Sequence, residues 1–238
     1  METLEITLIS SCPMNCTYCC QSLLKTKYNG NKFFTLNKFK DIIDKIPNNV
    51  RIDFSGFAEP FIVPDAIDMI EYASIKHKIT IFTTCMGMKR EDVDRISFIK
   101  NLEHLELHLQ DENMRFKPHK DDIINYIREK IPNHSEMNMS TSNVSLHDRA
   151  GNCDIGLHFN NIGNISCQGT INPRRGVLLP NGDVVLCCND YGLKHKLGNL
   201  FEQTYEEIYN SNEYKKIVKG FTDESLNTLC RKCYYARK

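Results

Sequence analysis

The stretch SCPMNCTYCCQ, residues 11–21, is the feature that most constrains this chain. Cys12, Cys16 and Cys19 form a C-x3-C-x2-C pattern, and Cys20 is an extra cysteine beside it. Structural zinc sites use four protein ligands. A cubane iron–sulfur cluster also has four corners, so three cysteines leave one iron open. The run therefore indicates a metal centre at which another ligand binds directly. A zinc site completed by a distant residue, or buried free thiols, are the alternatives.

Composition excludes several classes of protein. The 238 residues include 30 Lys and Arg and 30 Asp and Glu, so net charge favours neither a nucleic acid nor an anionic membrane as partner. No apolar run is long enough to span a membrane. The start METLEITLIS lacks the basic and apolar regions of a signal peptide, so we expect a cytoplasmic protein. In that reducing compartment, eleven cysteines indicate metal binding rather than disulfides.

Strands and helices are expected to alternate through the first 150 residues. The pattern predicts strands at 5–10, 50–54, 79–83, 105–109 and 137–141, and helices at 35–46, 64–76, 91–98 and 121–130. Such alternation favours an α/β fold, a partial (β/α) barrel of about five to six parallel strands. Chemistry in parallel barrels lies at the C-terminal ends of the strands. The cysteine run and the stretches 55–60, 83–86 and 110 onward all fall there, which predicts a single site.

The alternating pattern of strands and helices ends after residue 152. The stretches 177–179 and 184–186 flank Asn181-Gly182 and predict a β-hairpin, and 204–218 predicts a final helix. We therefore expect a core domain at 1–152 and a small module at 153–238. Four cysteines of this module could form a second centre, and their spacing alone also fits zinc. They are Cys167, Cys187, Cys230 and Cys233, with Cys188 as an alternative to Cys187.

The N-terminal pattern resembles the signature of the radical S-adenosylmethionine (SAM) superfamily. It has an aromatic residue, Tyr18, before the third cysteine, and it follows the first predicted strand. The resemblance implies that Cys12, Cys16 and Cys19 ligate a 4Fe–4S cluster and that SAM binds the open iron. In that family one electron cleaves SAM to an adenosyl radical, which removes a hydrogen atom from the substrate.

A second stretch, Ser55-Gly56-Phe57-Ala58-Glu59-Pro60, resembles the family's Gly-Gly-Glu-Pro segment, which holds the amino group of SAM. Phe57 and Ala58 replace the usual glycines, and an ordinary turn with a surface glutamate is the alternative. By the same resemblance, three further residues at or just beyond the ends of the third and fourth strands are expected to contact the cofactor. These are Thr83, His108 and Gln110.

The C-terminal module resembles the SPASM/twitch extension of radical enzymes. The resemblance rests on the hairpin with Cys187, on Leu197-Gly198-Asn199-Leu200 and on the closing Cys230-x2-Cys233. It implies one auxiliary 4Fe–4S cluster. Arg149-Ala150-Gly151 also stands where small twitch dehydrogenases, such as the enzyme acting on 2-deoxy-scyllo-inosamine, carry Arg-Gly-Gly. Arg149 is therefore expected to bind the substrate.

These resemblances imply a radical SAM oxidoreductase. Its substrate would be a sugar, cyclitol or nucleotide-linked sugar whose alcohol is oxidised, with the auxiliary cluster as electron acceptor and a flavodoxin- or ferredoxin-type donor. An epimerase is the first alternative, in which Cys153 or Cys85 donates a hydrogen atom; Cys20 and Cys188 are the other spare cysteines. A peptide-modifying enzyme ranks lower, because the chain begins directly on its first strand. A non-catalytic metal-binding module is the remaining alternative.

Overall fold

A computed structural model of the chain describes residues 2–14, 16, 18–109, 121–138 and 147–238. Its centre is an eight-stranded sheet with the strand order β5-β4-β3-β2-β1-β7-β8-β9. Neighbours from β5 through β7 run parallel, whereas β8 and β9 are antiparallel to their neighbours. The strands are β1 (Thr3–Ile6), β2 (Arg51–Phe54), β3 (Ile79–Thr83), β4 (Leu102–Leu109), β5 (His134–Asn138), β7 (Val177–Leu178), β8 (Asp183–Val185) and β9 (Lys196–Asn199). The predicted partial barrel is confirmed.

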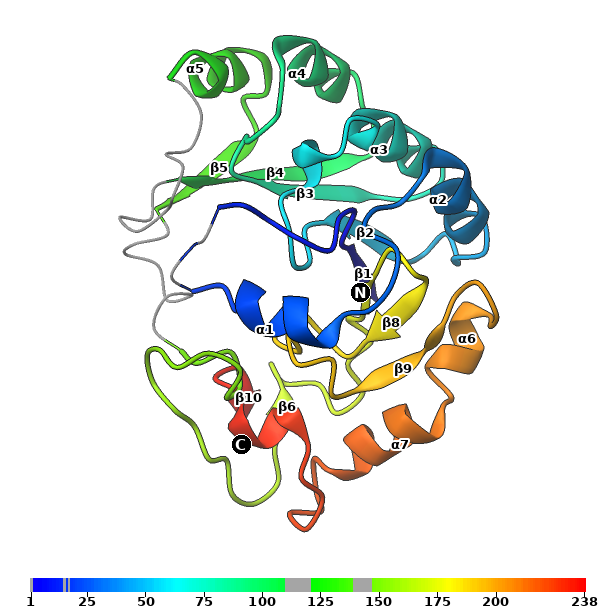
Figure 1. The fold of residues 1–238 in the computed structure, drawn as a ribbon, viewed down its shortest axis with the longest axis vertical. Coiled ribbons are helices and arrows are strands. Elements are labelled where there is room, and N and C mark those ends of the chain that lie inside the picture. Colours follow the sequence, from blue (N-terminus) through cyan, green and yellow to red (C-terminus); the bar gives the residue numbers. More distant parts are fainter. Residues whose placement is uncertain (1, 15, 17, 110–120, 139–146) are drawn as a thin grey trace.

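Helices cover the outer side of this curved sheet. Figure 1 shows α2 to α5 in an arc outside the strands, with α1 on the opposite side. The helices are α1 (Gln21–Lys27), α2 (Leu36–Ile43), α3 (Ala66–Ser74), α4 (Arg90–Ser97), α5 (Asp121–Lys130), α6 (Tyr205–Ile208) and α7 (Asn212–Lys219). Thr35 caps α2 by accepting a hydrogen bond from the Lys38 backbone N–H. Phe39, Ile42 and Ile43 are the buried face that the 3.6-residue period predicts.

The C-terminal residues both extend the sheet and build a separate small unit. Strand β7 pairs in parallel with β1, so the predicted hairpin β7–β8 joins the central sheet. Strand β6 (Ser166–Cys167) instead pairs with β10 (Ala236–Arg237) in a two-stranded sheet. In Figure 1 this second sheet lies beyond α1, near the C-terminus.

Three sequence predictions need correction. The first strand is Thr3–Ile6 rather than 5–10, and α1 was not predicted. The predicted helix 204–218 is two helices, because the Ser211 hydroxyl accepts a hydrogen bond from the Tyr214 N–H and starts α7 anew. The strand predicted at 137–141 is observed as His134–Asn138, and residues 139–141 lie outside the described part. Within the described residues, no helix is both long and apolar enough to cross a membrane.

Candidate active site

A cavity of about 290 Å³ opens at the C-terminal ends of the parallel strands. We call it the larger cavity. Except for Cys153, it brings together all the described residues that the sequence analysis assigned to the first cluster, to the cofactor or to the substrate. These are Cys12, Cys16, Tyr18, Cys19, Gly56, Phe57, Ala58, Glu59, Thr83, His108 and Arg149. The predicted contact Gln110 lies outside the described residues.

The cysteine loop is joined to the loop after β2 by Gln21, a residue that the sequence analysis overlooked. The Gln21 Oε1 accepts a hydrogen bond from the Cys12 N–H at 3.4 Å, and its Nε2 donates to the Phe57 carbonyl. The side chain is buried in the first turn of α1. The position of Gln21 directly after the cysteine run is the signal by which the sequence could have identified it. Gln21 therefore fixes the relative position of the two loops that resemble family motifs.

Tyr191 also contacts the cysteine loop. Its hydroxyl lies 3.4 Å from the Cys19 Sγ, and its ring centroid is 4.6 Å from that of Phe57. Both aromatic side chains are buried. Burial also raises the pKa of the Cys12 thiol. These contacts place two buried aromatic rings beside the cysteine loop and link it to the C-terminal part of the chain.

Gly56 begins the loop after β2 in a conformation that requires glycine. Its φ is +67°, and a Cβ there would collide with the Thr7 hydroxyl. The same hydroxyl accepts a hydrogen bond from the Phe57 N–H at 3.0 Å. The backbone of this segment is thus held against Thr7, the residue after β1, although Phe57 and Ala58 replace the family glycines.

Glu59 presents a fixed carboxyl to the larger cavity. Its Oε1 accepts a hydrogen bond from the Thr83 hydroxyl at 2.6 Å, and its Oε2 accepts bonds from the Thr84 N–H at 2.7 Å and hydroxyl at 2.8 Å. Burial raises the pKa of this carboxyl, and the bonds from Thr83 and Thr84 act in the opposite direction. A carboxylate held this firmly suits a cationic amino group. Thr84 is a contributor that the sequence analysis did not single out.

His108 lies in the same cavity, on β4. Its Nε2 is 2.9 Å from the Glu106 Oε1, and its ring centroid is 5.8 Å from that of Phe82. Both neighbours also line the larger cavity. The histidine is therefore oriented by its neighbours at the wall of the larger cavity.

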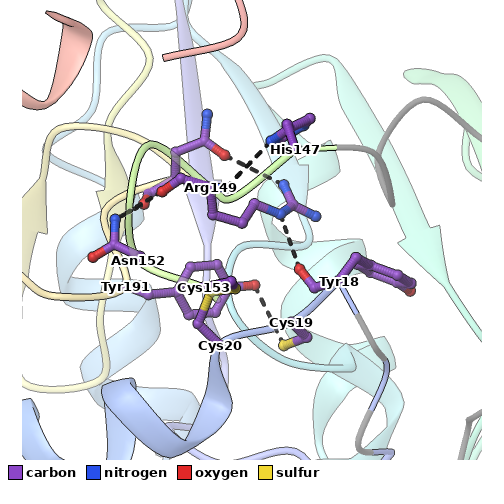
Figure 2. Close-up of a disulfide and its surroundings, with 9 residues drawn as sticks. Tyr18, Cys19, Cys20, His147, Arg149, Asn152, Cys153 and Tyr191 are labelled. Carbon is purple, nitrogen blue, oxygen red and sulfur yellow. Dashed lines mark hydrogen bonds between the residues drawn. A yellow bond between two sulfur atoms is a disulfide. The ribbon is translucent and has the colours of Figure 1, made fainter. Parts of the chain in front are cut away.

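Arg149 enters the larger cavity from a tight turn. Arg149 and Ala150 have positive φ values of 49° and 58°, and Gly151 follows with 84°. The Arg149 Nε donates to the Tyr18 carbonyl at 3.0 Å and its Nη1 to the Asn189 Oδ1 at 3.4 Å, as Figure 2 shows for Tyr18. Only 8% of the residue is exposed. The guanidinium is thus placed between the cysteine loop and the C-terminal part of the chain.

A disulfide between Cys20 and Cys153 joins the same two segments (Figure 2). The two Cα atoms are 5.5 Å apart. The expectation that these cysteines form no disulfide is therefore wrong for this pair, because the N-terminus of α1 and the turn after Arg149 meet in the fold. Cys153 consequently carries no S–H hydrogen, which contradicts its predicted role as a donor. The other predicted donor, Cys85, is buried and does not line the larger cavity.

A smaller cavity of about 110 Å³ lies beside the first. It gathers the four cysteines predicted for the second centre together with the alternative, namely Cys167, Cys187, Cys188, Cys230 and Cys233. Cys167 comes from β6, whereas Cys230 lies in the 3-10 helix Leu229–Lys232 and Cys233 directly follows it. The tertiary structure thus assembles segments that are far apart in sequence.

The neighbours of Cys187 and Cys188 differ. Burial raises the pKa of both thiols well above the usual range. The pKa of Cys187 is raised further by Cys188 and then by Cys233 and Cys230. The pKa of Cys188 is raised next by Glu5, whereas Arg149 lowers it. Of the two cavities, Cys187 lines only the smaller one, whereas Cys188 lines both.

The two cavities share a wall. Glu5, Cys188 and Tyr235 line both of them. Tyr235 follows Cys233 by two residues, and its ring centroid lies 5.3 Å from that of His147. The ring of Tyr234 also lies beside His147, at 5.0 Å.

Among the described residues, no three His, Cys, Asp or Glu side chains converge closely enough to hold a single metal ion.

Comparison of the sequence with protein-family models identifies the family of the chain. Residues 6–139 match the model of the Radical SAM superfamily. This chain belongs to the radical SAM superfamily. Residues 167–234 match the SPASM model, described as an iron–sulfur cluster-binding domain. The protein is thus a radical SAM enzyme that uses a 4Fe–4S cluster, SAM and an auxiliary iron–sulfur cluster. The zinc interpretations are not supported, and neither is a non-catalytic module.

Solved structures share this fold. BtrN in complex with AdoMet and 2-DOIA has a TM-score of 0.75 at 16% identity, covering 100% of this chain and 93% of its own. The anSMEcpe enzyme with bound AdoMet has a TM-score of 0.58 at 14% identity, with 98% and 86% covered. Streptococcus suis SuiB bound to S-adenosylmethionine has a TM-score of 0.59 at 14% identity, with 97% and 71% covered. No curated protein sequence matches the chain.

Proposed function

We propose that this radical SAM enzyme oxidises an alcohol group of a small polar substrate, such as a sugar, a cyclitol or a nucleotide-linked sugar. The observation that carries the proposal is the wall shared by the two cysteine-lined cavities. A substrate in the larger cavity would lie next to the auxiliary centre, which suits removal of an electron. Similarity in fold to BtrN, whose structure contains 2-DOIA, supports a substrate of this size.

The residues fit the groups that the family uses. We assign Cys12, Cys16 and Cys19 to the first cluster, and the four cysteines Cys167, Cys187, Cys230 and Cys233 to the auxiliary one. The fixed carboxyl of Glu59 and the Gly56–Ala58 backbone suit the amino group of SAM, with Tyr18, Thr83 and His108 as further contacts. When bound, these groups supply the adenosyl radical that abstracts a substrate hydrogen and an acceptor for one electron.

The protein itself positions the substrate and excludes water. Arg149 offers a planar set of donors to a hydroxyl oxygen of the substrate. Phe57 and Tyr191 shield the cysteine loop with packed aromatic rings. The alcohol loses one hydrogen atom from carbon, one proton from oxygen and one electron, and becomes a carbonyl group. Because the shared wall separates the substrate from the auxiliary centre, it is the route that we propose for that electron.

Product analysis tests the proposal. Anaerobic holoenzyme with SAM, a low-potential reductant and a panel of polyols is expected to form 5′-deoxyadenosine and a carbonyl product in equal amounts. Mass spectrometry would show a product two hydrogen atoms lighter than the substrate. A product of unchanged mass would contradict dehydrogenation.

An epimerase is the second candidate, and one observation favours it. Cys188 lines the larger cavity and is not among the cysteines we assign to the clusters. A thiol there could return a hydrogen atom to a substrate radical. Turnover in deuterium oxide would then place one deuterium at an inverted carbon, and Cys188→Ala would remove that label while 5′-deoxyadenosine still forms.

Three further assignments accompany the proposal. We place the core at 1–152 and the auxiliary module at 153–238, although β7 of the module pairs with β1 of the core. A flavodoxin- or ferredoxin-type protein would supply the electron, and the enzyme would be cytoplasmic. A peptide substrate, as in the structure of SuiB with its precursor peptide SuiA, is less favoured by a cavity of about 290 Å³.

A further inference from the structure

The larger cavity is lined by more acidic than basic groups. Four carboxyl groups face it, those of Glu5, Asp53, Glu59 and Glu106. Arg149 is the one Lys or Arg side chain among the described residues that line it. The guanidinium of Arg149 already donates hydrogen bonds to the Tyr18 carbonyl and the Asn189 side chain. The balance of charge therefore favours a ligand that carries a positive group over one that carries phosphate.

Three of these carboxyl groups have an evident partner. Asp53 accepts two hydrogen bonds from the Arg51 guanidinium, at 2.7 and 2.9 Å. Glu106 is 2.9 Å from the His108 Nε2. Glu59 is held by the donors on Thr83 and Thr84, and the proposed function gives it the amino group of SAM. None of the three needs a charged group of the substrate.

Glu5 differs from the other three. It lies on β1 directly opposite Asp53 in the register with β2, and its Oε2 accepts a hydrogen bond from the Ser55 hydroxyl at 2.9 Å. Within the described parts of the chain, no Lys, Arg or His nitrogen lies within 4.0 Å of its carboxyl. Burial and then the neighbouring Asp53 raise its pKa, whereas hydrogen bonds from the neutral donors Ser55, Cys188 and the Gly56 backbone act in the opposite direction. A carboxyl placed in such surroundings lacks the positive charge that would stabilise its ionised form.

We infer that Glu5 is a specificity residue that binds an ammonium group of the substrate. This inference rests on the proposed function, because it treats the larger cavity as the substrate site. Glu5 also lines the smaller cavity, so the amine end of the substrate lies at the shared wall. Among the three substrate classes above, an amine-bearing sugar or cyclitol fits these charges best. A nucleotide-linked sugar would bring phosphate charges into an acidic cavity.

Binding of matched compounds tests the inference without requiring turnover. We would titrate anaerobic holoenzyme with SAM bound, using calorimetry and ligand-observed NMR, with glucosamine, glucose, scyllo-inosamine and scyllo-inositol. In each pair the ring is the same and one hydroxyl replaces the amine. Wild-type enzyme is expected to bind at least one amine about tenfold or more tightly than its hydroxyl partner, because a charge-assisted hydrogen bond is lost.

Variants then assign that preference to one side chain. Glu5→Gln is expected to bind amine and hydroxyl partners equally, whereas Glu5→Asp keeps the preference with weaker affinity. Glu206→Gln, at an exposed ion pair with Arg174, is the matched control and should behave as wild type. Iron content and thermal unfolding would establish that each variant is folded.

Two results would overturn the inference. One is a wild-type enzyme that binds no amine of the panel at 20 mM, or that binds each amine no more tightly than its hydroxyl partner. The inference requires a difference in affinity on the order of tenfold. The other is an unchanged preference in Glu5→Gln. Formation of 5′-deoxyadenosine and carbonyl product, measured in the same samples, reports separately on the proposed function. Its absence alongside an intact amine preference would contradict the oxidation and leave the role of Glu5 supported.

Discussion

The two cysteine-lined cavities are built in different ways. The cysteines assigned to the larger cavity all lie between positions 12 and 19, on one loop after β1. Those of the smaller cavity come from β6, from the segment after β8 and from the 3-10 helix Leu229–Lys232 with the residue after it. A site on one loop can form wherever that loop is placed correctly. A site made of three segments exists only when the surrounding tertiary structure has formed.

The comparison also separates two chemical roles. Three cysteines leave a position on the cluster for a cofactor, whereas four can occupy every iron of an auxiliary cluster. The larger cavity accordingly contains polar groups that can hold ligands, such as Glu59 and Arg149. The smaller cavity is lined mainly by cysteines and apolar side chains. We expect loss of a cysteine to have different consequences in the two.

The largest effect is expected from Cys16→Ala. Loss of this ligand should abolish cleavage of SAM, by at least about three orders of magnitude, because the reactive cluster no longer forms. Formation of 5′-deoxyadenosine is the measurement. Cys85→Ala, at a buried cysteine outside both cavities, is the matched control and should retain activity. Cleavage at the wild-type rate in Cys16→Ala would show that the N-terminal loop is not the reactive site.

A second variant sharpens the contrast between the cavities. Cys230→Ala is expected to retain cleavage of SAM but to lose at least about tenfold in substrate oxidation, since the electron acceptor is missing. Iron analysis should fall from about eight to about four atoms per chain. The ratio of carbonyl product to 5′-deoxyadenosine measures the loss. Full product formation would mean that the auxiliary cluster is dispensable for turnover.

The disulfide tests how far the two regions depend on each other. The double variant Cys20→Ser with Cys153→Ser should lower the free energy of unfolding by about 2–4 kcal/mol, because a cross-link over 133 residues of sequence restricts the unfolded chain. Chemical denaturation without reductant measures this difference. With dithiothreitol present the variant and the wild type should converge. A difference that persists under reducing conditions would mean that the serines disturb packing instead.

His147 offers the smallest and most local test. Burial lowers the pKa of this imidazole to about 4, so the folded protein resists protonation that the unfolded chain accepts near its usual pKa of 6.5. Stability present above pH 6.5 is therefore lost as the pH falls towards 4, by about 1–2 kcal/mol. His147→Phe keeps a ring beside Tyr234 and cannot titrate.

The melting temperature between pH 7.5 and 4.5 is the measurement for this variant. His147→Phe should lose less stability than the wild type over that range. An equal loss in both proteins would assign the acid sensitivity to other groups. His147 contacts Tyr235, which belongs to the shared wall. A change in product yield in His147→Phe would therefore show that His147 also affects the two cavities.

Local patterns predicted the larger cavity well, for a physical reason. Cys12, Cys16 and Cys19 are neighbours on one loop, and Gly56 and Glu59 follow the next strand. Parallel strands end at the same edge of a sheet, so these loops meet whatever the detailed packing. The period of apolar residues likewise placed α2 and β3 almost correctly. The missed Gln21 contributes through a contact between loops that no periodic pattern records.

The sequence by itself determined the radical SAM motif, the alternation of strands and helices, and the existence of a second group of cysteines. Only the tertiary structure decided that β7 pairs with β1, that Cys20 meets Cys153, and that Glu5 stands in a wall between two cavities. The reason is the range of the interactions. Motif spacing and hydrophobic period act over a few residues. Strand pairing, disulfide geometry and the charge balance of a cavity depend on segments more than a hundred residues apart.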